Sequence, residues 1–174
     1  MQETKSLQEA VEERGNKALT SAHLLTLKGK AEMGLVGGLV ASIVASFIAV
    51  AADDAGLLVT PWFPTVASAF GIAGLPSDVG LLGLTLFVAI GVLWGLVFAF
   101  VFRKYSVTEG LAFSGVQLVL TVALLIIVST PQVGGTLLSL PLLNSLKLVI
   151  GLALTYIGFG VVMGYTGKKY AGLP

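Results

Sequence analysis

Four long stretches without a charged side chain constrain this chain more than any other feature of its sequence. They cover residues 33–52, 79–102, 110–130 and 148–166, and none of them contains Asp, Glu, Lys, Arg or His. A membrane-spanning helix needs about 20 predominantly apolar residues. A helix of a soluble bundle has a polar stripe along one side, and these stretches have none. The sequence therefore predicts an all-α fold, an integral membrane four-helix bundle.

The composition excludes several other classes of protein. Only 11% of the residues are charged, against about 25% in a soluble domain. The chain has no Cys, which excludes disulfides, thiolate metal sites and cysteine nucleophiles. The net charge is +1, so nothing indicates a nucleic-acid partner.

The basic residues predict the orientation of the spans. If four spans alternate, nine of the ten Lys and Arg residues lie on one side of the membrane, and only Lys147 lies on the other. Basic residues gather on the cytoplasmic side, so we expect both termini in the cytoplasm and the protein in the cell membrane. The nine residues are Lys5, Arg14, Lys17, Lys28, Lys30, Arg103, Lys104, Lys168 and Lys169.

The N-terminal segment differs from the rest of the chain. Residues 3–27 place Leu7, Val11 and Ala18 on one helical face, which predicts an amphipathic cytoplasmic helix. We therefore divide the chain into an N-terminal helix, residues 1–30, and a transmembrane domain, residues 31–174. The apolar face is small, so docking onto protein is at least as well supported as lying on lipid.

Two stretches of the chain end alike. "GLVFAFVFRKY" covers residues 95–105 and "GVVMGYTGKKY" covers residues 160–170. A duplicated helical hairpin, residues 32–105 and 109–170, explains the likeness and predicts two parallel repeats. Alternatively, basic flanks and interfacial Tyr residues arise independently in many membrane proteins.

Small residues recur at four-residue spacing on three of the spans. Such residues let membrane helices approach closely, and residues four apart share one face. The faces either pack the four helices together or dock another subunit. The predicted helix-packing residues are Gly34, Gly38, Ser42, Ser46, Gly91, Gly95, Gly160 and Gly164.

Turns and caps follow from local sequence. "SVTE" predicts a capping box between Ser106 and Glu109, and Ser77 with Asp78 suits the cap of the second span. Residues 61–72 predict a short interfacial helix that ends at Gly71 or Gly74. The apolar loop 131–144 folds back onto the membrane surface or a partner. The expected interfacial anchors are Trp62, Tyr105 and Tyr170.

Few side chains within the spans offer chemistry. Gln117 is the most polar, and its amide either bonds a neighbouring helix or contacts a substrate. Thr121, Thr155 and Tyr156 are weaker candidates for the same contacts. His23 is the single histidine, and Asp53, Asp54 and Asp78 are best explained as solvated loop acids. We expect no catalytic residue, no metal site, no cofactor and no enzymatic activity.

Three segments carry a resemblance to known proteins: "GLVGGLVAS" at residues 34–42, "FRKY" at 102–105 and "GFGVVMGYTGKKY" at 158–170. With these, the chain resembles small four-span membrane proteins of prokaryotes, common in archaea, that have no assigned function. The resemblance covers about residues 33–170. Some of these relatives carry a His in the last span about where this chain has Tyr156, and that difference weakens a metal or haem site inferred from the resemblance.

Two functions remain after these exclusions. The leading hypothesis is a non-catalytic accessory subunit of a larger membrane complex, plausibly respiratory or a membrane oxidase, with unlike subunits on its small-residue faces. The alternative is a small homo-oligomeric channel or transporter for a neutral or apolar solute, with Gln117, Thr121 and Thr155 along its path.

Overall fold

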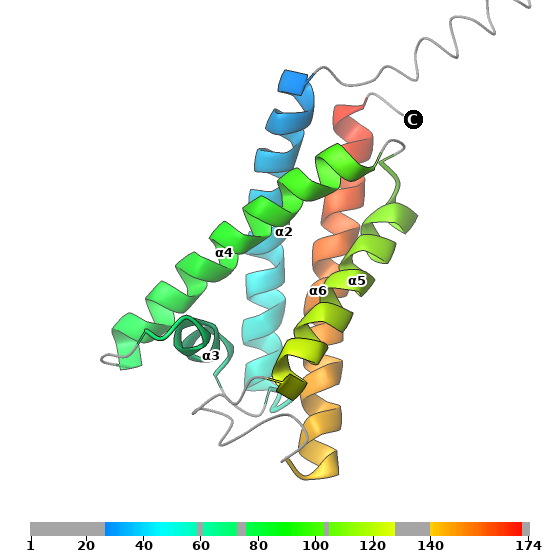
Figure 1. The fold of residues 1–174 in the computed structure, drawn as a ribbon. Helices are drawn as coiled ribbons and strands as arrows, with labels where there is room; N and C mark the ends of the chain where they lie inside the picture. Colours follow the sequence, from blue (N-terminus) through cyan, green and yellow to red (C-terminus); the bar gives the residue numbers. More distant parts are fainter. Residues whose placement is uncertain (1–26, 59–60, 73–75, 103–104, 128–139, 172–174) are drawn as a thin grey trace, which may run out of the picture.

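The computed structural model describes residues 27–58, 61–72, 76–102, 105–127 and 140–171. Within these residues the chain forms five helices and no strand. The N-terminal helix predicted for residues 1–30 lies outside the described residues except for its last four. Figure 1 shows the helices, which are α2 Leu27–Asp54, α3 Trp62–Ala69, α4 Pro76–Val101, α5 Val107–Ile127 and α6 Leu142–Tyr170.

Four of the helices, α2, α4, α5 and α6, are long and apolar enough to cross a membrane. This confirms the four predicted spans. Their outward faces carry large exposed apolar side chains such as Phe47, Leu93 and Val119. In water each of these would cost roughly 1.5–3 kcal/mol relative to burial, whereas in a bilayer they contact lipid tails at no such cost. The chain is a membrane protein on these grounds.

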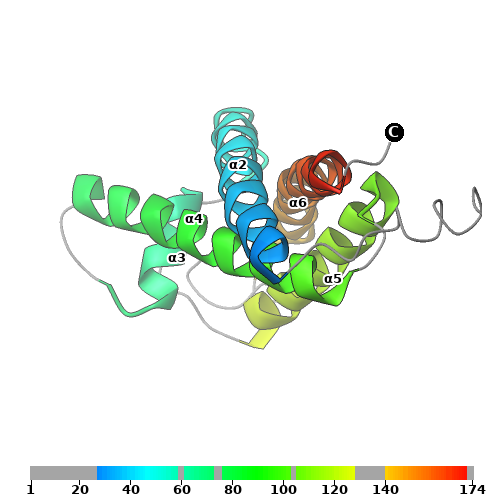
Figure 2. The same cartoon turned by 90° about the horizontal axis from the view of Figure 1, so that it is seen from above.

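Helix α2 lies at the centre of the arrangement. It packs against α4 on one side and α6 on another, while α5 packs on α6 and α3 packs on α4. Helix α4 crosses α2 at a steep angle (Figure 1). Consequently α4 and α5 approach each other at one end of the bundle and diverge toward the other, as Figures 1 and 2 show. We call the first the basic end, because it holds Lys28, Lys30, Lys168 and Lys169, and the second the acidic end, with Asp53, Asp54 and Asp78.

Glycines set the crossing of α2 and α4. A Cβ atom at Gly95 would overlap the Gly34 carbonyl oxygen, and one at Gly38 would lie 2.9 Å from the Gly91 carbonyl oxygen. The two backbones therefore touch directly, as small residues permit in membranes. All four were predicted as packing residues, and here they pack against each other within one chain.

The crossing of α5 and α6 uses the same device. A Cβ atom at Gly160 would lie 2.6 Å from the Gly110 carbonyl oxygen, and one at Gly164 would lie 2.5 Å from the backbone of Val107. Ser114 fills the position four residues after Gly110 and also lies against Gly160. The predicted small faces of α2, α4 and α6 are thus occupied by helices of this same chain.

The turn between α4 and α5 is fixed by Tyr105 and a capping box. Ser106 N donates to Glu109 Oε2 and Glu109 N donates to Ser106 Oγ, both at 3.1 Å, which confirms the predicted box. Tyr105 has a φ of 46°, an unfavourable angle for a residue with a bulky side chain. Its hydroxyl donates to the Ala99 carbonyl oxygen at 2.8 Å, and this buried bond holds the turn.

Several predicted boundaries are wrong. Helix α6 begins at Leu142 rather than at residue 148, inside the predicted loop 131–144. Polar residues at 144, 145 and 147 lower the local hydropathy, yet a helix tolerates them near the headgroups, where a Lys stem can extend its charge to water. Helix α4 begins at Pro76, so Ser77 and Asp78 lie in its first turn, where the Asp78 carboxylate suits the positive end of the helix dipole as predicted. The short helix α3 is confirmed, and Gly71 follows it with a φ of 72°.

Candidate functional site

A cavity of about 410 Å³ lies in the space where α4 and α5 diverge. Phe87, Ile90 and Trp94 of α4 form one wall, and residues of α5 from 117 to 125 form the opposite one. Tyr156 and Phe159 of α6 form its base together with α2. Its volume falls within the range of about 300–1,000 Å³ typical of small-molecule sites.

Helix α3 bounds the cavity toward the acidic end. Trp62, Thr65 and Phe70 contribute to the lining. Helix α3 is held tightly on α4, because a Cβ atom at Gly83 would overlap the backbone carbonyl of Phe63. The short helix predicted as interfacial therefore forms part of the cavity wall.

Aromatic rings close the cavity toward the basic end. Trp94 and Phe113 meet edge to face with ring centroids 5.6 Å apart, and Phe98 lies 5.4 Å from Phe113. Phe102 stacks on Phe98 at 4.9 Å. These rings bridge α4 and α5 just where the two helices approach, so the cavity has a closed end and a wider end beside α3.

Two polar side chains on the lining satisfy each other. The hydroxyl oxygens of Thr121 and Tyr156 lie 2.6 Å apart, a strong hydrogen bond by its length. Both residues line the cavity. The bond joins α5 to α6 and leaves polar oxygen atoms beside an otherwise apolar surface.

Two further polar atoms on the lining have no partner. Gln117 is 3% exposed and Trp62 is 8% exposed. Among the described residues, Gln117 Oε1 and Trp62 Nε1 are buried without a hydrogen bond. Each unsatisfied buried group costs about 1–3 kcal/mol. One is an acceptor and the other a donor, but neither atom is itself exposed to the cavity, so a hydroxyl-bearing molecule would reach either one only after that side chain rotates.

The remaining predicted polar residues bond within their own helices. Ser42 Oγ donates to Gly38 O at 2.6 Å and Ser46 Oγ donates to Ser42 O at 2.8 Å. Thr155 Oγ1 donates to Gly151 O at 2.9 Å, and it does not line the cavity. Of the four predicted intramembrane contacts, the structure therefore brings Gln117, Thr121 and Tyr156 together and leaves Thr155 apart.

The expected interfacial anchors differ from one another. Tyr170 is 40% exposed at the end of α6, as an anchor requires. Tyr105 is 2% exposed and packs under the α4–α5 turn against Gly167. Trp62 is buried against the cavity. A Tyr or Trp ring has an apolar body and one polar group, so it suits both the membrane interface and a buried site with a polar partner. The residue type therefore does not distinguish these two roles.

The cavity shows no arrangement for metal or acid–base chemistry. Its lining, as far as the chain is described, contains no Asp, Glu, Lys, Arg or His. The described residues also contain no group of three or more potential metal ligands, so Asp53, Asp54 and Asp78 do not form a cluster. The lining can bind by shape, apolar contact and a few hydrogen bonds.

Sequence reasoning missed the apolar wall of the site, namely Phe87, Ile90 and Leu124. They carry no signal, because the same residue types face lipid elsewhere on these helices. Comparisons with protein-family models, curated proteins and solved structures found no match for this chain.

Proposed function

We propose that this protein binds a neutral, largely apolar molecule in the cavity between α4 and α5, as the binding step of a carrier or transporter for such solutes. The observation that carries the proposal is an uncharged, largely apolar cavity whose lining includes Gln117 and Trp62, each with a buried polar atom that has no hydrogen bond among the described residues. After rotation of the side chain concerned, a ligand hydroxyl would donate to Gln117 Oε1 or accept from Trp62 Nε1. Its apolar body would contact Phe87, Ile90 and Leu124.

The absence of charge on the described lining supports a neutral ligand. A carboxylate or ammonium group in this cavity would lose its hydration without gaining an ion-pair partner, at a cost of several kcal/mol. A neutral hydroxyl group loses far less on leaving water, and it can donate to Gln117 Oε1 or accept from Trp62 Nε1, whereas a carbonyl group can only accept from Trp62 Nε1. Long-chain alcohols and similar neutral amphiphiles from the bilayer fit these conditions.

The accessory-subunit hypothesis is the second proposal. Its motivation was a set of small-residue faces, and those of α2, α4 and α6 contact each other within the chain. What still supports it is the divergence of α4 and α5, since a helix of another subunit could enter there and present its own polar side chain to Gln117. Oligomeric state and parent complex are part of this proposal.

The orientation and the duplication are also proposals. Lys28, Lys30, Lys168 and Lys169 share one end of the bundle, which supports a cytoplasmic location for that end of a protein in the cell membrane. Equivalent contacts support the duplication. Gly95 against Gly34 in the first hairpin matches Gly160 against Gly110 in the second.

The two Trp residues of the chain provide a direct binding test. Trp62 and Trp94 both line the cavity, so a brominated long-chain alcohol bound there quenches their fluorescence. In nanodiscs we expect saturable quenching by the alcohol and much weaker binding of the brominated fatty acid. Gln117→Leu should weaken binding about tenfold, the effect of losing roughly 1.4 kcal/mol.

Val116→Leu is the matched control, because Val116 lies on the same helix but faces outward. It should quench like the wild type. Quenching that instead rises linearly with the concentration of the brominated alcohol, and equally in the wild type and Gln117→Leu, would mean that the alcohol is only dissolved in the lipid. That result would contradict the proposal. Quenching by a water-soluble ion would show that the cavity is hydrated, which contradicts an apolar ligand site. A second protein that co-purifies and cross-links to residue 117 would favour the accessory-subunit hypothesis instead.

A further inference from the structure

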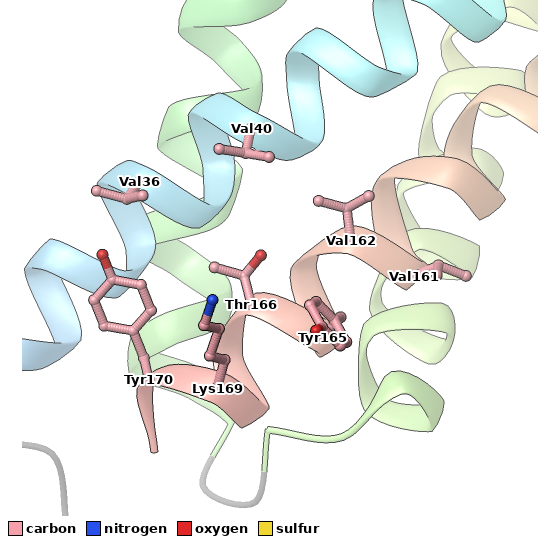
Figure 3. Close-up of a pocket in the computed structure, with 8 residues that line it drawn as sticks. All are labelled: Val36, Val40, Val161, Val162, Tyr165, Thr166, Lys169 and Tyr170. Carbon is pink, nitrogen blue, oxygen red and sulfur yellow. The ribbon is translucent and has the colours of Figure 1, made fainter. Parts of the chain in front are cut away.

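A second hollow lies on the other side of the molecule, between α2 and α6 at the basic end. It is a groove of about 750 Å³, separate from the α4–α5 cavity and sharing none of its lining residues. Figure 3 shows Val36 and Val40 of α2 facing Val162 and Thr166 of α6 across it. Its properties are independent of the function proposed above.

The groove changes from apolar to polar along its length. Val40, Val161 and Val162 line the part farther from the end of α6, and Val36 lies beside Tyr170 (Figure 3). Lys169 and Tyr170 line the part at the end of α6. From residue 161 to residue 169 the helix rises about 12 Å, enough to accommodate a substantial part of a lipid tail.

Three donors line the polar end. The Lys169 ammonium group extends into the space between the helices near Thr166, and the Tyr170 ring reaches toward Val36 (Figure 3). Among the described residues, none of the hydroxyls of Thr166 and Tyr170 or the ammonium of Lys169 has a hydrogen bond or ion pair. Donors without acceptors at the headgroup level match the oxygen atoms of a phosphate.

The surrounding charge favours an anion as well. Lys28 forms an exposed ion pair with Glu32 at 3.9 Å, whereas Lys169 has no such partner among the described residues. The last turn of α6 also carries Lys168. Within the described part of the chain, Lys168 and Lys169 therefore give the end of this groove a positive charge.

We infer that this groove binds one anionic membrane lipid, with its phosphate on Lys169, Thr166 and Tyr170 and a tail along the four valines. A zwitterionic lipid offers the same phosphate, but Lys168 and Lys169 repel its ammonium group. A basic pocket between helix ends is a setting in which anionic headgroups bind. A soluble phosphate lacks the tail contacts and should bind poorly.

Native mass spectrometry of the full chain tests this inference. Released from bilayers with equal amounts of phosphatidylglycerol and phosphatidylcholine of the same tails, the wild type should retain phosphatidylglycerol preferentially. Lys169→Gln should reduce that preference roughly fivefold, as expected for the loss of a direct ion pair with the phosphate. Excess inorganic phosphate should not displace the lipid.

Lys168→Gln is the matched control. It removes the same charge from the adjacent residue, which does not line the groove, so the preference should fall less than in Lys169→Gln. Val40→Phe, at a partly exposed position, should reduce retention of both lipids by filling the tail part. Equal retention of the two lipids by the wild type, or equal losses in the two Lys variants, would overturn the inference.

Discussion

The hydroxyl oxygens of Thr121 and Tyr156 lie 2.6 Å apart and join α5 to α6 at the edge of the cavity. Removing one partner should cost stability, because the other hydroxyl remains beside apolar walls. Interhelical hydrogen bonds in membranes contribute about 0.6 kcal/mol on average and up to about 1.7. We expect Tyr156→Phe to lower the free energy of unfolding by about 1 kcal/mol.

A double-mutant cycle with Thr121→Val measures the bond itself. The two single losses should not add, since both variants remove the same interaction. The readout is denaturant unfolding in mixed micelles. Fully additive losses would mean that the two hydroxyls act independently.

Gly95 tests the close contact of α2 and α4. Gly95→Ala places a methyl group against the Gly34 backbone and should destabilise the protein by about 1–3 kcal/mol through overpacking. Gly115→Ala is the control, because nothing lies within 4 Å of its added Cβ atom. That variant should be neutral or gain up to about 1 kcal/mol from helix propensity. Equal effects in thermal unfolding would contradict a backbone contact at Gly95.

Replacing Gln117 should stabilise the ligand-free protein and weaken ligand binding. Its buried oxygen has no partner among the described residues, so Gln117→Leu removes a desolvation cost and should stabilise the ligand-free protein by about 1 kcal/mol. The same variant should lose stabilisation by a bound alcohol. Thermal shift with and without the alcohol checks both. A destabilised ligand-free variant would mean that the amide is already satisfied.

The capping box offers a prediction outside the membrane core. Ser106→Ala removes the acceptor for Glu109 N and should cost about 1 kcal/mol. Glu109→Gln should cost less, since Gln also completes a capping box. The measurement is the free energy of unfolding of each variant. A larger loss for Glu109→Gln than for Ser106→Ala would mean that the charge of Glu109 stabilises the turn more than the capping hydrogen bond does.

Tyr105 should make stability depend on pH in the alkaline range. Burial raises the pKa of Tyr105 above 10.0, and the nearby Glu109 carboxylate raises it further. The folded state therefore holds this proton more tightly than the unfolded state. The resulting contribution is fully present below about pH 10 and decreases as pH rises above it. The stability difference between the wild type and Tyr105→Phe should shrink above pH 10, and a constant difference would contradict this reasoning.

Part of this structure was predictable from local sequence. Uncharged apolar runs of sufficient length predict the four spans, because lipid requires them. The capping box followed from Ser106 and Glu109, which lie three residues apart and need no tertiary information. The start of α6 was missed because hydropathy reports where lipid begins, while a helix continues through polar residues such as Lys147.

The cavity was not predictable in the same way. Polarity alone selected Gln117, Thr121 and Tyr156, but their convergence with Trp62 depends on how α4 crosses α2. That crossing depends on which glycines meet, and a row of small residues specifies a contact face without naming its partner. For the same reason the sequence left open whether Gly34 and Gly95 face another subunit, although they face each other.

The most direct measurement is the identification of what the purified protein carries. Organic extraction of wild type and Gln117→Leu, followed by mass spectrometry, should recover a neutral, hydroxyl-bearing amphiphile in stoichiometric amount from the wild type and in clearly smaller amount from Gln117→Leu. Both variants would still carry the anionic lipid of the α2–α6 groove. A neutral molecule equally abundant in both variants, or none in the wild type, would contradict a ligand site between α4 and α5.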